Sequence, residues 1–257
     1  MQLVCSIIHI LDIAGKPVVN ILNINRTCHD RCVDFRKINL LPQMHHLKGG
    51  VLMSTNTTTA ATAREEEDSK LKKLVFAGVF AAITYVVFTY LAIRIPTPGA
   101  GQVSVHLGNA FVVLGALLLG GLYGGIGGAI GLTIADLIDP VYIVEAPITF
   151  IIKFLIGLIV GIIAHRVAHI STETDNKKVL RWVIIATIAG LAFNAFFDPL
   201  LRYFYKILIL GKPAAEVSFA INLVVTLINS VVSAVIVVIL YMALRTPLKK
   251  LGLFFRL

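Results

Sequence analysis

The chain has 257 residues, of which 57% are hydrophobic and only 14% are charged, and its formal net charge is +9. Soluble domains carry about 25% charged residues, so this composition excludes a wholly water-soluble globule and predicts an all-α membrane protein. The Lys and Arg residues lie between apolar runs, which is typical of membrane topology and excludes a nucleic-acid-binding surface.

The first part of the chain differs from the rest. Residues 1–52 contain all three cysteines and four of the seven histidines, so no disulfide framework is available to the apolar part. The Lys-Gly-Gly sequence at 48–50 is typical of a translated bacterial ribosome-binding site, and Met53 follows it closely. We hypothesise that residues 1–71 are a disordered tail, and that 1–52 are an untranslated leader with Met53 as the true start.

An alternative for this region is a metal site. Cys28, Cys32, His45 and His46 provide four ligands of the types that bind zinc within 19 residues. No apolar sequence flanks these residues to hold them in place. We therefore favour the disordered tail and predict no metal site.

Six apolar runs predict transmembrane helices, which need about 20 mostly apolar residues each. The runs are 74–93, 107–119, 122–138, 147–164, 182–205 and 217–244. Only two glycines separate the short second run from the third, which leaves open a re-entrant hairpin in place of two full spans. We predict a six-helix membrane domain over residues 72–245, followed by a basic tail at 246–257.

The distribution of positive charge predicts the orientation. With six spans, both termini and the 165–181 loop lie on one side of the membrane. That side carries twelve Lys and Arg residues. The opposite side carries four, in the loops at 94–106, 139–146 and 206–216 and at the end of the 182–205 span. Positive charge concentrates on the cytoplasmic side of membrane proteins. Both termini are therefore expected in the cytoplasm.

Four polar residues inside the predicted spans indicate a binding pocket, because ionisable and amide groups are costly in a membrane and usually functional. They are Lys153, Asn194, Asp198 and Asn222. All four lie in the halves of their helices near the external loops, and Asn194, Asp198 and Arg202 share one helix face through their four-residue spacing. Lys153 is expected to extend to the outer surface or to pair with Asp136 or Glu145.

Other polar and small residues are expected to serve helix packing. Thr226 and Ser233 in the last span are expected to hold helices together by hydrogen bonds. Glycines between 120 and 131 recur at four-residue spacing, which lets helix backbones approach closely. The chain lacks the Gly-x-x-x-x-Gly-Lys-Ser/Thr loop that binds nucleotide phosphates, so a partner or an ion gradient has to supply the energy for uphill transport.

Several short sequences in the first four runs form a recognisable set. They are Ala77-Gly-Val-Phe-Ala81, Arg94-Ile-Pro-Thr-Pro98, His106-Leu-Gly-Asn109, Ala135-Asp136-Leu137 and Ala146-Pro-Ile-Thr-Phe-Ile-Ile-Lys153. In these sequences, and in its six spans, the chain resembles the substrate-binding S components of energy-coupling-factor (ECF) vitamin transporters of bacteria. The resemblance covers about 170 of the 257 residues and is weaker over the last two spans.

The resemblance implies a binding subunit without catalytic residues, cofactor or metal. It implies that Ala77 and Ala81 dock against a transmembrane T subunit. Two cytosolic ATPases are expected to bind that subunit and to power transport. Residues 94–106 are expected to cap the ligand. The expected substrate-binding residues are His106, Asn109, Glu145, Lys153, Asn194, Asp198 and Asn222. The sequences around His106 and Lys153 are most similar to S components assigned to hydroxymethylpyrimidine or pyridoxine-like compounds.

Two other functions fit a polytopic membrane chain less well. A stand-alone secondary transporter is expected to show an inverted repeat between its halves, and none is evident. An intramembrane enzyme needs a catalytic motif, and His-Glu-x-x-His and Gly-x-Ser-x-Gly are both absent. We therefore expect a subunit of the bacterial plasma membrane that binds a small polar vitamin or vitamin precursor for import.

Overall fold

The computed structural model describes residues 55–97, 101–211 and 215–255. The hypothesis of an untranslated leader, and the candidate metal ligands Cys28, Cys32, His45 and His46, lie outside these residues.

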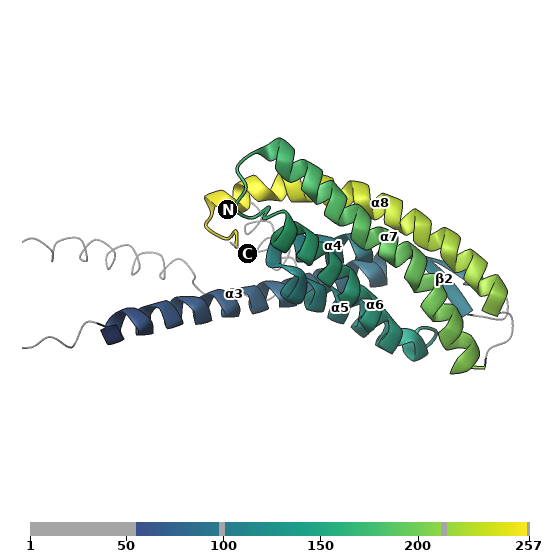
Figure 1. Cartoon of the computed structure of the whole chain (residues 1–257). Coiled ribbons are helices and arrows are strands. Elements are labelled where there is room, and N and C mark those ends of the chain that lie inside the picture. Colours follow the sequence, from purple (N-terminus) through teal and green to yellow (C-terminus); the bar gives the residue numbers. More distant parts are fainter. Residues whose placement is uncertain (1–54, 98–100, 212–214, 256–257) are drawn as a thin grey trace, which may run out of the picture. The chain divides into compact units, whose positions relative to one another are not determined.

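Within the described residues, helices form most of the structure. The elements are α3 (Thr55–Tyr90), β1 (Ile93–Thr97), β2 (Gly101–Val105), α4 (Gly108–Leu119), α5 (Gly121–Ile138), the 3₁₀ turn η2 (Ile143–Glu145), α6 (Ala146–Gly161), the π-helical turn η3 (Ile162–Val167), α7 (Asn176–Leu208) and α8 (Ala215–Lys250). Figure 1 shows their arrangement, with α7 and α8 packed along each other.

Five helical segments are long and apolar enough to cross a membrane. They are Glu67–Tyr90, Gly121–Ile138, Ile143–Val167, Asn176–Leu208 and Phe219–Lys250. Many of their large apolar side chains are exposed, including Leu74 and Val75 on α3 and Ile184 and Ile188 on α7. Such surfaces are stable in lipid and costly in water, so this is a multi-pass α-helical membrane protein. The predicted second span is the shorter apolar helix Gly108–Leu119.

Helix α3 begins earlier than the sequence predicts. It starts at Thr55, so residues 55–71, predicted to be part of a disordered tail, are helical in the structure. Once an apolar helix has formed, extending it by further turns costs little, because the unfavourable nucleation step is already complete. The spacing of Asp68 and Lys72 adds a favourable i,i+4 charge pair to this extension.

The predicted all-α membrane fold fits the structure, which adds one short pair of strands that the sequence analysis did not predict. Residues 93–97 and 101–105 form two antiparallel strands in which Ile93 pairs with Val105 and Ile95 with Val103. These β-branched residues alternate with Arg94, Pro96 and Ser104, a pattern that favours strands. Pro96 also disfavours a helix here, because it lacks a backbone N–H donor.

Helix α4 is the centre of the core. Eleven of its residues are buried, and it contacts α5, α6, α7 and α8. Gly120 alone separates it from α5, with a φ of 88°, a conformation that glycine adopts without steric cost. The chain therefore reverses between the two helices without a longer loop.

The glycines of α5 allow close contact with the helices on either side, as their spacing predicts. A β-carbon built on Gly124 would lie 2.2 Å from the carbonyl oxygen of Gly115 in α4. On α6, a β-carbon at Gly157 would lie 2.3 Å from the α-carbon of Gly125. The backbones of α4, α5 and α6 therefore pack directly against one another, which fixes the positions of the polar side chains that these helices carry.

Candidate functional site

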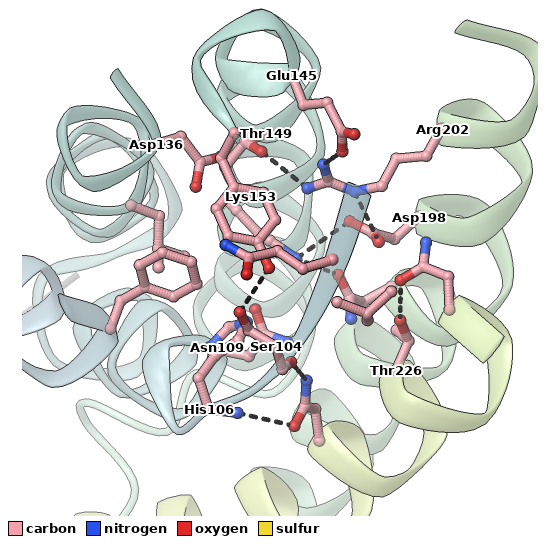
Figure 2. A pocket seen from close by; sticks show the side chains of 18 of the residues that line it. Ser104, His106, Asn109, Asp136, Glu145, Thr149, Lys153, Asp198, Arg202 and Thr226 are labelled. Carbon is pink, nitrogen blue, oxygen red and sulfur yellow. Dashed lines mark hydrogen bonds and ion pairs between the residues drawn. The ribbon is translucent and has the colours of Figure 1, made fainter. Parts of the chain in front are cut away.

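A polar cavity lies among α4–α8, beneath the β1–β2 hairpin (Figure 2). Its volume is about 50 Å³, which is room for a few water molecules. The lining residues are Phe88, Gln102, Val103, Ser104, His106, Asn109, Leu132, Asp136, Tyr142, Glu145, Thr149, Lys153, Asn194, Asp198, Arg202, Lys206, Asn222, Thr226 and Asn229. From the predicted loop at 94–106, residues 102–104 of β2 and His106 line the cavity, and the capping role of the loop stays a prediction.

Lys153 of α6 links two residues of α7. Its Nζ donates a hydrogen bond of 2.8 Å to Asn194 Oδ1 and one of 3.3 Å to Asp198 Oδ1. The Lys153 and Asp198 side chains are each only 5% exposed, so this ion pair is shielded from water. The expected partners, Asp136 and Glu145, are not the ones that Lys153 contacts, because the four-residue spacing on α7 brings Asn194 and Asp198 opposite α6.

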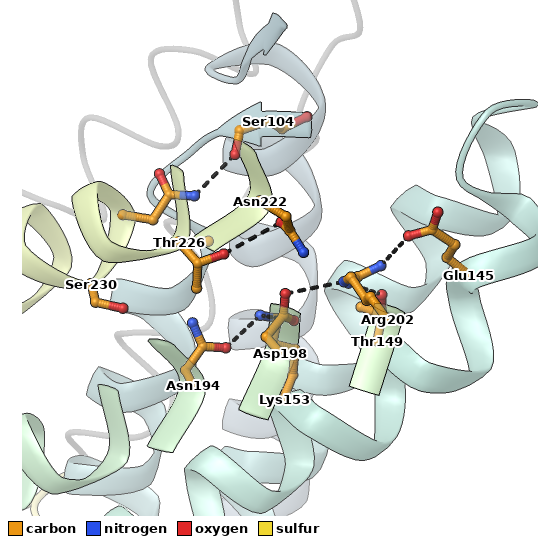
Figure 3. A network of polar contacts seen from close by, with 12 residues as sticks. Ser104, Glu145, Thr149, Lys153, Asn194, Asp198, Arg202, Asn222, Thr226 and Ser230 are labelled. Atoms are coloured by element: carbon orange, nitrogen blue, oxygen red, sulfur yellow. Dashed lines mark hydrogen bonds and ion pairs between the residues drawn. The ribbon is translucent and has the colours of Figure 1, made fainter. Parts of the chain in front are cut away.

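Arg202 connects α7 to the start of α6 (Figure 3). Its Nε donates to Asp198 Oδ2 over 3.1 Å, its Nη1 to Glu145 Oε2 over 2.5 Å and its Nη2 to Thr149 Oγ1 over 2.8 Å. Lys206 contacts the other oxygen of Glu145 at 3.3 Å. A guanidinium with planar, charge-assisted contacts of this kind holds its partners in fixed orientations.

Asp136 of α5 joins the network through a hydroxyl group. Thr149 forms a side-chain hydrogen bond with Asp136, and it accepts one from Arg202, so the Thr149 proton is directed to the carboxylate. Asp136 is 3% exposed. The guanidinium of Arg202 thus lies among three carboxylates, which belong to Asp136 of α5, Glu145 just before α6 and Asp198 of α7.

The hairpin is attached to α8 by one amide side chain. Asn229 Oδ1 accepts from the backbone N–H of His106 over 3.0 Å, and its Nδ2 donates to the carbonyl oxygen of Ser104 over 2.9 Å. On the other side, the Ser104 hydroxyl is 2.7 Å from the Tyr142 hydroxyl. Burial raises the pKa of Tyr142 to about 12, so this contact is between two neutral hydroxyl groups.

The His106 side chain lines the cavity and also holds the start of α4. Its Nδ1 accepts a 3.0 Å hydrogen bond from the Gly108 backbone N–H at the start of α4, one of the donors that a helix N-terminus leaves unpaired. Burial, and then the positive charge of Lys153, lower the pKa of His106 to about 3. The ring is therefore neutral, and its remaining proton is assigned to Nε2.

Two buried amides of the cavity carry atoms without a hydrogen-bond partner among the described residues. These atoms are Asn194 Nδ2 and Asn109 Oδ1. An ammonium group can only donate, so the contact with Lys153 fixes Asn194 Oδ1 toward it and leaves Nδ2 directed away. Buried polar atoms without partners are rare in folded proteins, and here both belong to residues that line the cavity.

All seven predicted substrate-binding residues line this one cavity: His106, Asn109, Glu145, Lys153, Asn194, Asp198 and Asn222. Their role in binding is a prediction that geometry alone does not test. Sequence reasoning did not select Arg202, Lys206, Thr149 or Asp136 for the site. The signal for Arg202 and Lys206 was present, since both continue the four-residue spacing of Asn194 and Asp198.

The docking role predicted for Ala77 and Ala81 stays a prediction, and in the structure both residues also lie against α5. Ala77 is buried, and β-carbons built on Gly127 and Gly131 of α5 would lie 2.5 Å and 2.2 Å from the carbonyl oxygens of Ala77 and Ala81. The backbone of α3 at these two residues therefore packs closely against α5. Gly78 and Ala82, one position further along the helix, are the exposed small residues.

Comparison with known proteins agrees with this architecture. Residues 68–246 match the family model described as ECF-type riboflavin transporter, S component. No curated protein matches the chain. The family match spans more than half of the chain and includes every element that lines the cavity, so the protein belongs to the family of ECF transporter S components.

Proposed function

We propose that this S component binds a compact, polar, single-ring vitamin or vitamin precursor, of the hydroxymethylpyrimidine or pyridoxine type, in the cavity beneath the β1–β2 hairpin. Family membership gives the coarser function: a membrane subunit that confers substrate specificity on a vitamin importer, and not an enzyme. The observation that carries the finer proposal is the pair of buried amide atoms, on Asn109 and Asn194, that have no hydrogen-bond partner in the described part of the chain. A ligand seated between them supplies the missing hydrogen bonds.

The size of the cavity supports a single-ring compound. Its volume of about 50 Å³ is well below the about 300 Å³ at which drug-sized ligand pockets begin. A single six-membered ring with short substituents requires a small outward movement of the hairpin. The three fused rings and ribityl chain of riboflavin require a much larger one.

Riboflavin is the second candidate, because the matching family model carries its name. The described cavity lining includes Phe88 and Tyr142, aromatic rings against which a flavin could stack. Stacking of aromatic rings contributes about 0.5–1.5 kcal/mol per pair, which is similar to the net contribution of one hydrogen bond.

Titration calorimetry of the detergent-purified chain tests the proposal. Hydroxymethylpyrimidine, pyridoxine and riboflavin are titrated separately, and tightest binding by either single-ring compound supports it. Tightest binding by riboflavin would establish the second candidate. Mass spectrometry of any compound released from the freshly purified protein by denaturation gives an independent answer, since it does not depend on the choice of probes.

A further inference from the structure

The charged side chains that line the cavity balance one another. The cations are Lys153, Arg202 and Lys206, and the carboxylates are Asp136, Glu145 and Asp198. Lys153, Arg202 and Lys206 each form an ion pair with Asp198 or Glu145, and Asp136 reaches Arg202 through Thr149. His106 is neutral, so the wall has no net charge before a ligand enters.

This balance has a consequence for what the cavity accepts. A ligand with a net charge would leave one charge uncompensated in a site shielded from water, and the penalty for burying an unpaired ion is several kcal/mol. A ligand without net charge meets no such penalty. It needs only to match the hydrogen-bonding groups that the wall leaves available.

The wall offers both donors and acceptors. Asp136 has about four acceptor positions, and the Thr149 hydroxyl occupies one of them. Asn109 Oδ1 is a second acceptor, while Asn194 Nδ2 and His106 Nε2 are donors. Asn109, Asp136 and Asn194 are all at least nine-tenths buried, so these groups are available to a ligand inside the cavity and not to bulk water.

We infer that the ligand of this cavity is uncharged, that it donates an N–H or O–H to Asp136, and that it accepts a hydrogen bond from Asn194 Nδ2. Asp136 is then a specificity-determining residue. This inference rests on the proposed vitamin-binding function and adds the charge class of the substrate and two of its contacts. An aminopyrimidine or hydroxypyridine ring has the required combination of an exocyclic donor and a ring-nitrogen acceptor.

Matched pairs of compounds test the charge class at pH 7.5. The pairs are hydroxymethylpyrimidine and thiamine, pyridoxine and pyridoxal 5′-phosphate, and riboflavin and its 5′-phosphate. The second member of each pair carries an added charge. In every pair that binds, we expect the first member to bind at least tenfold more tightly. A charged member that binds as tightly as its uncharged counterpart, or more tightly, would overturn the inference.

The variant Asp136→Asn tests the assigned contact. It keeps the shape of the side chain, replaces one acceptor oxygen by a donor and gives the wall a net positive charge. We expect at least tenfold weaker binding of the uncharged probe, and a smaller preference for riboflavin over its anionic 5′-phosphate. The control is Asp175→Asn, at the N-terminus of α7 outside the cavity, where asparagine is an equally good cap and binding should not change.

The outcomes distinguish failure of the inference from failure of the proposed function. Unchanged affinity in Asp136→Asn, or tight binding of a charged compound, would contradict the inference and leave vitamin binding in place. Failure of all six compounds to bind would contradict the proposed function, and the inference would fall with it.

Discussion

At the scale of single residues, Lys153 has two tasks in the cavity wall. It neutralises Asp198, and it holds the Asn194 amide so that Nδ2 is directed away from the ion pair. Because Asp198 also contacts Arg202, loss of the ammonium group leaves that carboxylate with one cation. The Asn194 amide, in contrast, loses the contact that determines which way it points.

We therefore predict that Lys153→Met weakens ligand binding at least tenfold, since a hydrogen bond to a charged group contributes about 1.5–3 kcal/mol. Methionine retains most of the apolar stem, so the chain should still insert and fold. Calorimetry of the purified variant measures the loss. Lys178→Met is the matched control, because Lys178 is exposed and pairs with Glu173 away from the cavity. Equal affinities of Lys153→Met and the unmodified chain would remove Lys153 from the site.

Burial of His106 leads us to expect that the stability of the folded protein depends on pH. Its pKa is about 3 in the folded protein, lowered by burial and by Lys153 and Arg202 and partly raised by Asp198, whereas an unfolded histidine has a pKa of about 6.5. Between these values the unfolded chain binds a proton that the folded chain does not. The contribution of His106 to stability is therefore complete above about pH 6.5 and is lost as the pH falls toward 3.

We expect protonation of His106 in the unfolded chain to lower the free energy of unfolding by up to about 2 kcal/mol at pH 5. This loss should appear as a lower melting temperature of the detergent-purified protein. His106→Gln cannot titrate and should flatten the profile between pH 7 and 5. His169→Asn is the control, because His169 is exposed and has a φ of 48°, which asparagine tolerates. A profile as steep in His106→Gln as in the unmodified chain would refute the assignment.

The sequence predicts part of the site for a clear physical reason. Lys153, Asn194, Asp198 and Asn222 are recognisable because polar groups inside apolar runs are costly. Arg202 lies within a predicted span and Lys206 just beyond it, yet both were counted with the external charges, because an apolar pattern does not define where a helix ends. The roles of Asp136 and Thr149 depend on contacts between helices, which spacing within one helix does not reveal.

At the scale of elements, the contact between α4 and α5 depends on Gly124. A β-carbon there would meet the backbone of Gly115 at 2.1–2.2 Å, and a backbone cannot move aside as the end of a side chain can. Substitution therefore forces the two helices apart.

We predict that Gly124→Ala lowers the melting temperature and weakens ligand binding, with an overpacking cost of about 1–3 kcal/mol. Gly78→Ala is the matched control on α3, where the added methyl group would have no atom within 4 Å. Alanine favours a helix over glycine by about 1 kcal/mol, so this control should be neutral or slightly stabilising. The same response in both variants would contradict the packing argument.

The exposed pair Gly78 and Ala82 provides a second test on α3. Both keep the four-residue spacing of Ala77 and Ala81, but they face away from α5. We expect Ala82→Leu to leave ligand binding intact and to reduce uptake in cells that contain the partner subunits, because a bulky side chain blocks close approach of another helix. Ala77→Leu, against Gly127, should instead lower the melting temperature. Full uptake by Ala82→Leu would exclude this surface as the docking site.

The elements themselves differ in how well sequence predicts them. Each predicted helical run lies within or close to a helix of the structure, because about 20 apolar residues leave few alternatives to a transmembrane helix. The β1–β2 hairpin was missed, since its five-residue strands contain a proline and pair through contacts that become apparent only in three dimensions. The early start of α3 was missed because residues 55–71 lack the apolar run by which the helices were predicted.

At the scale of the whole molecule, the orientation in the membrane remains a prediction from charge. It places residues 139–142 outside the cell and the 168–175 connection inside. In a background without native cysteines, Val141→Cys should react with a membrane-impermeant maleimide in intact cells, and Thr172→Cys only after permeabilisation. Both positions are exposed. The reverse labelling pattern would show that the chain has the opposite orientation.

The short central helix has a consequence for how the chain is made. At 1.5 Å per residue, the twelve residues of α4 extend about 18 Å, while the hydrocarbon core of a bilayer is about 30 Å thick. Such a segment cannot remain in lipid by itself during synthesis. Joined to α5 through Gly120 alone, it has to leave the insertion machinery together with α5 as one helical hairpin. The walls of the cavity include residues of α7 and α8, so the cavity cannot be complete before the last helix has been made.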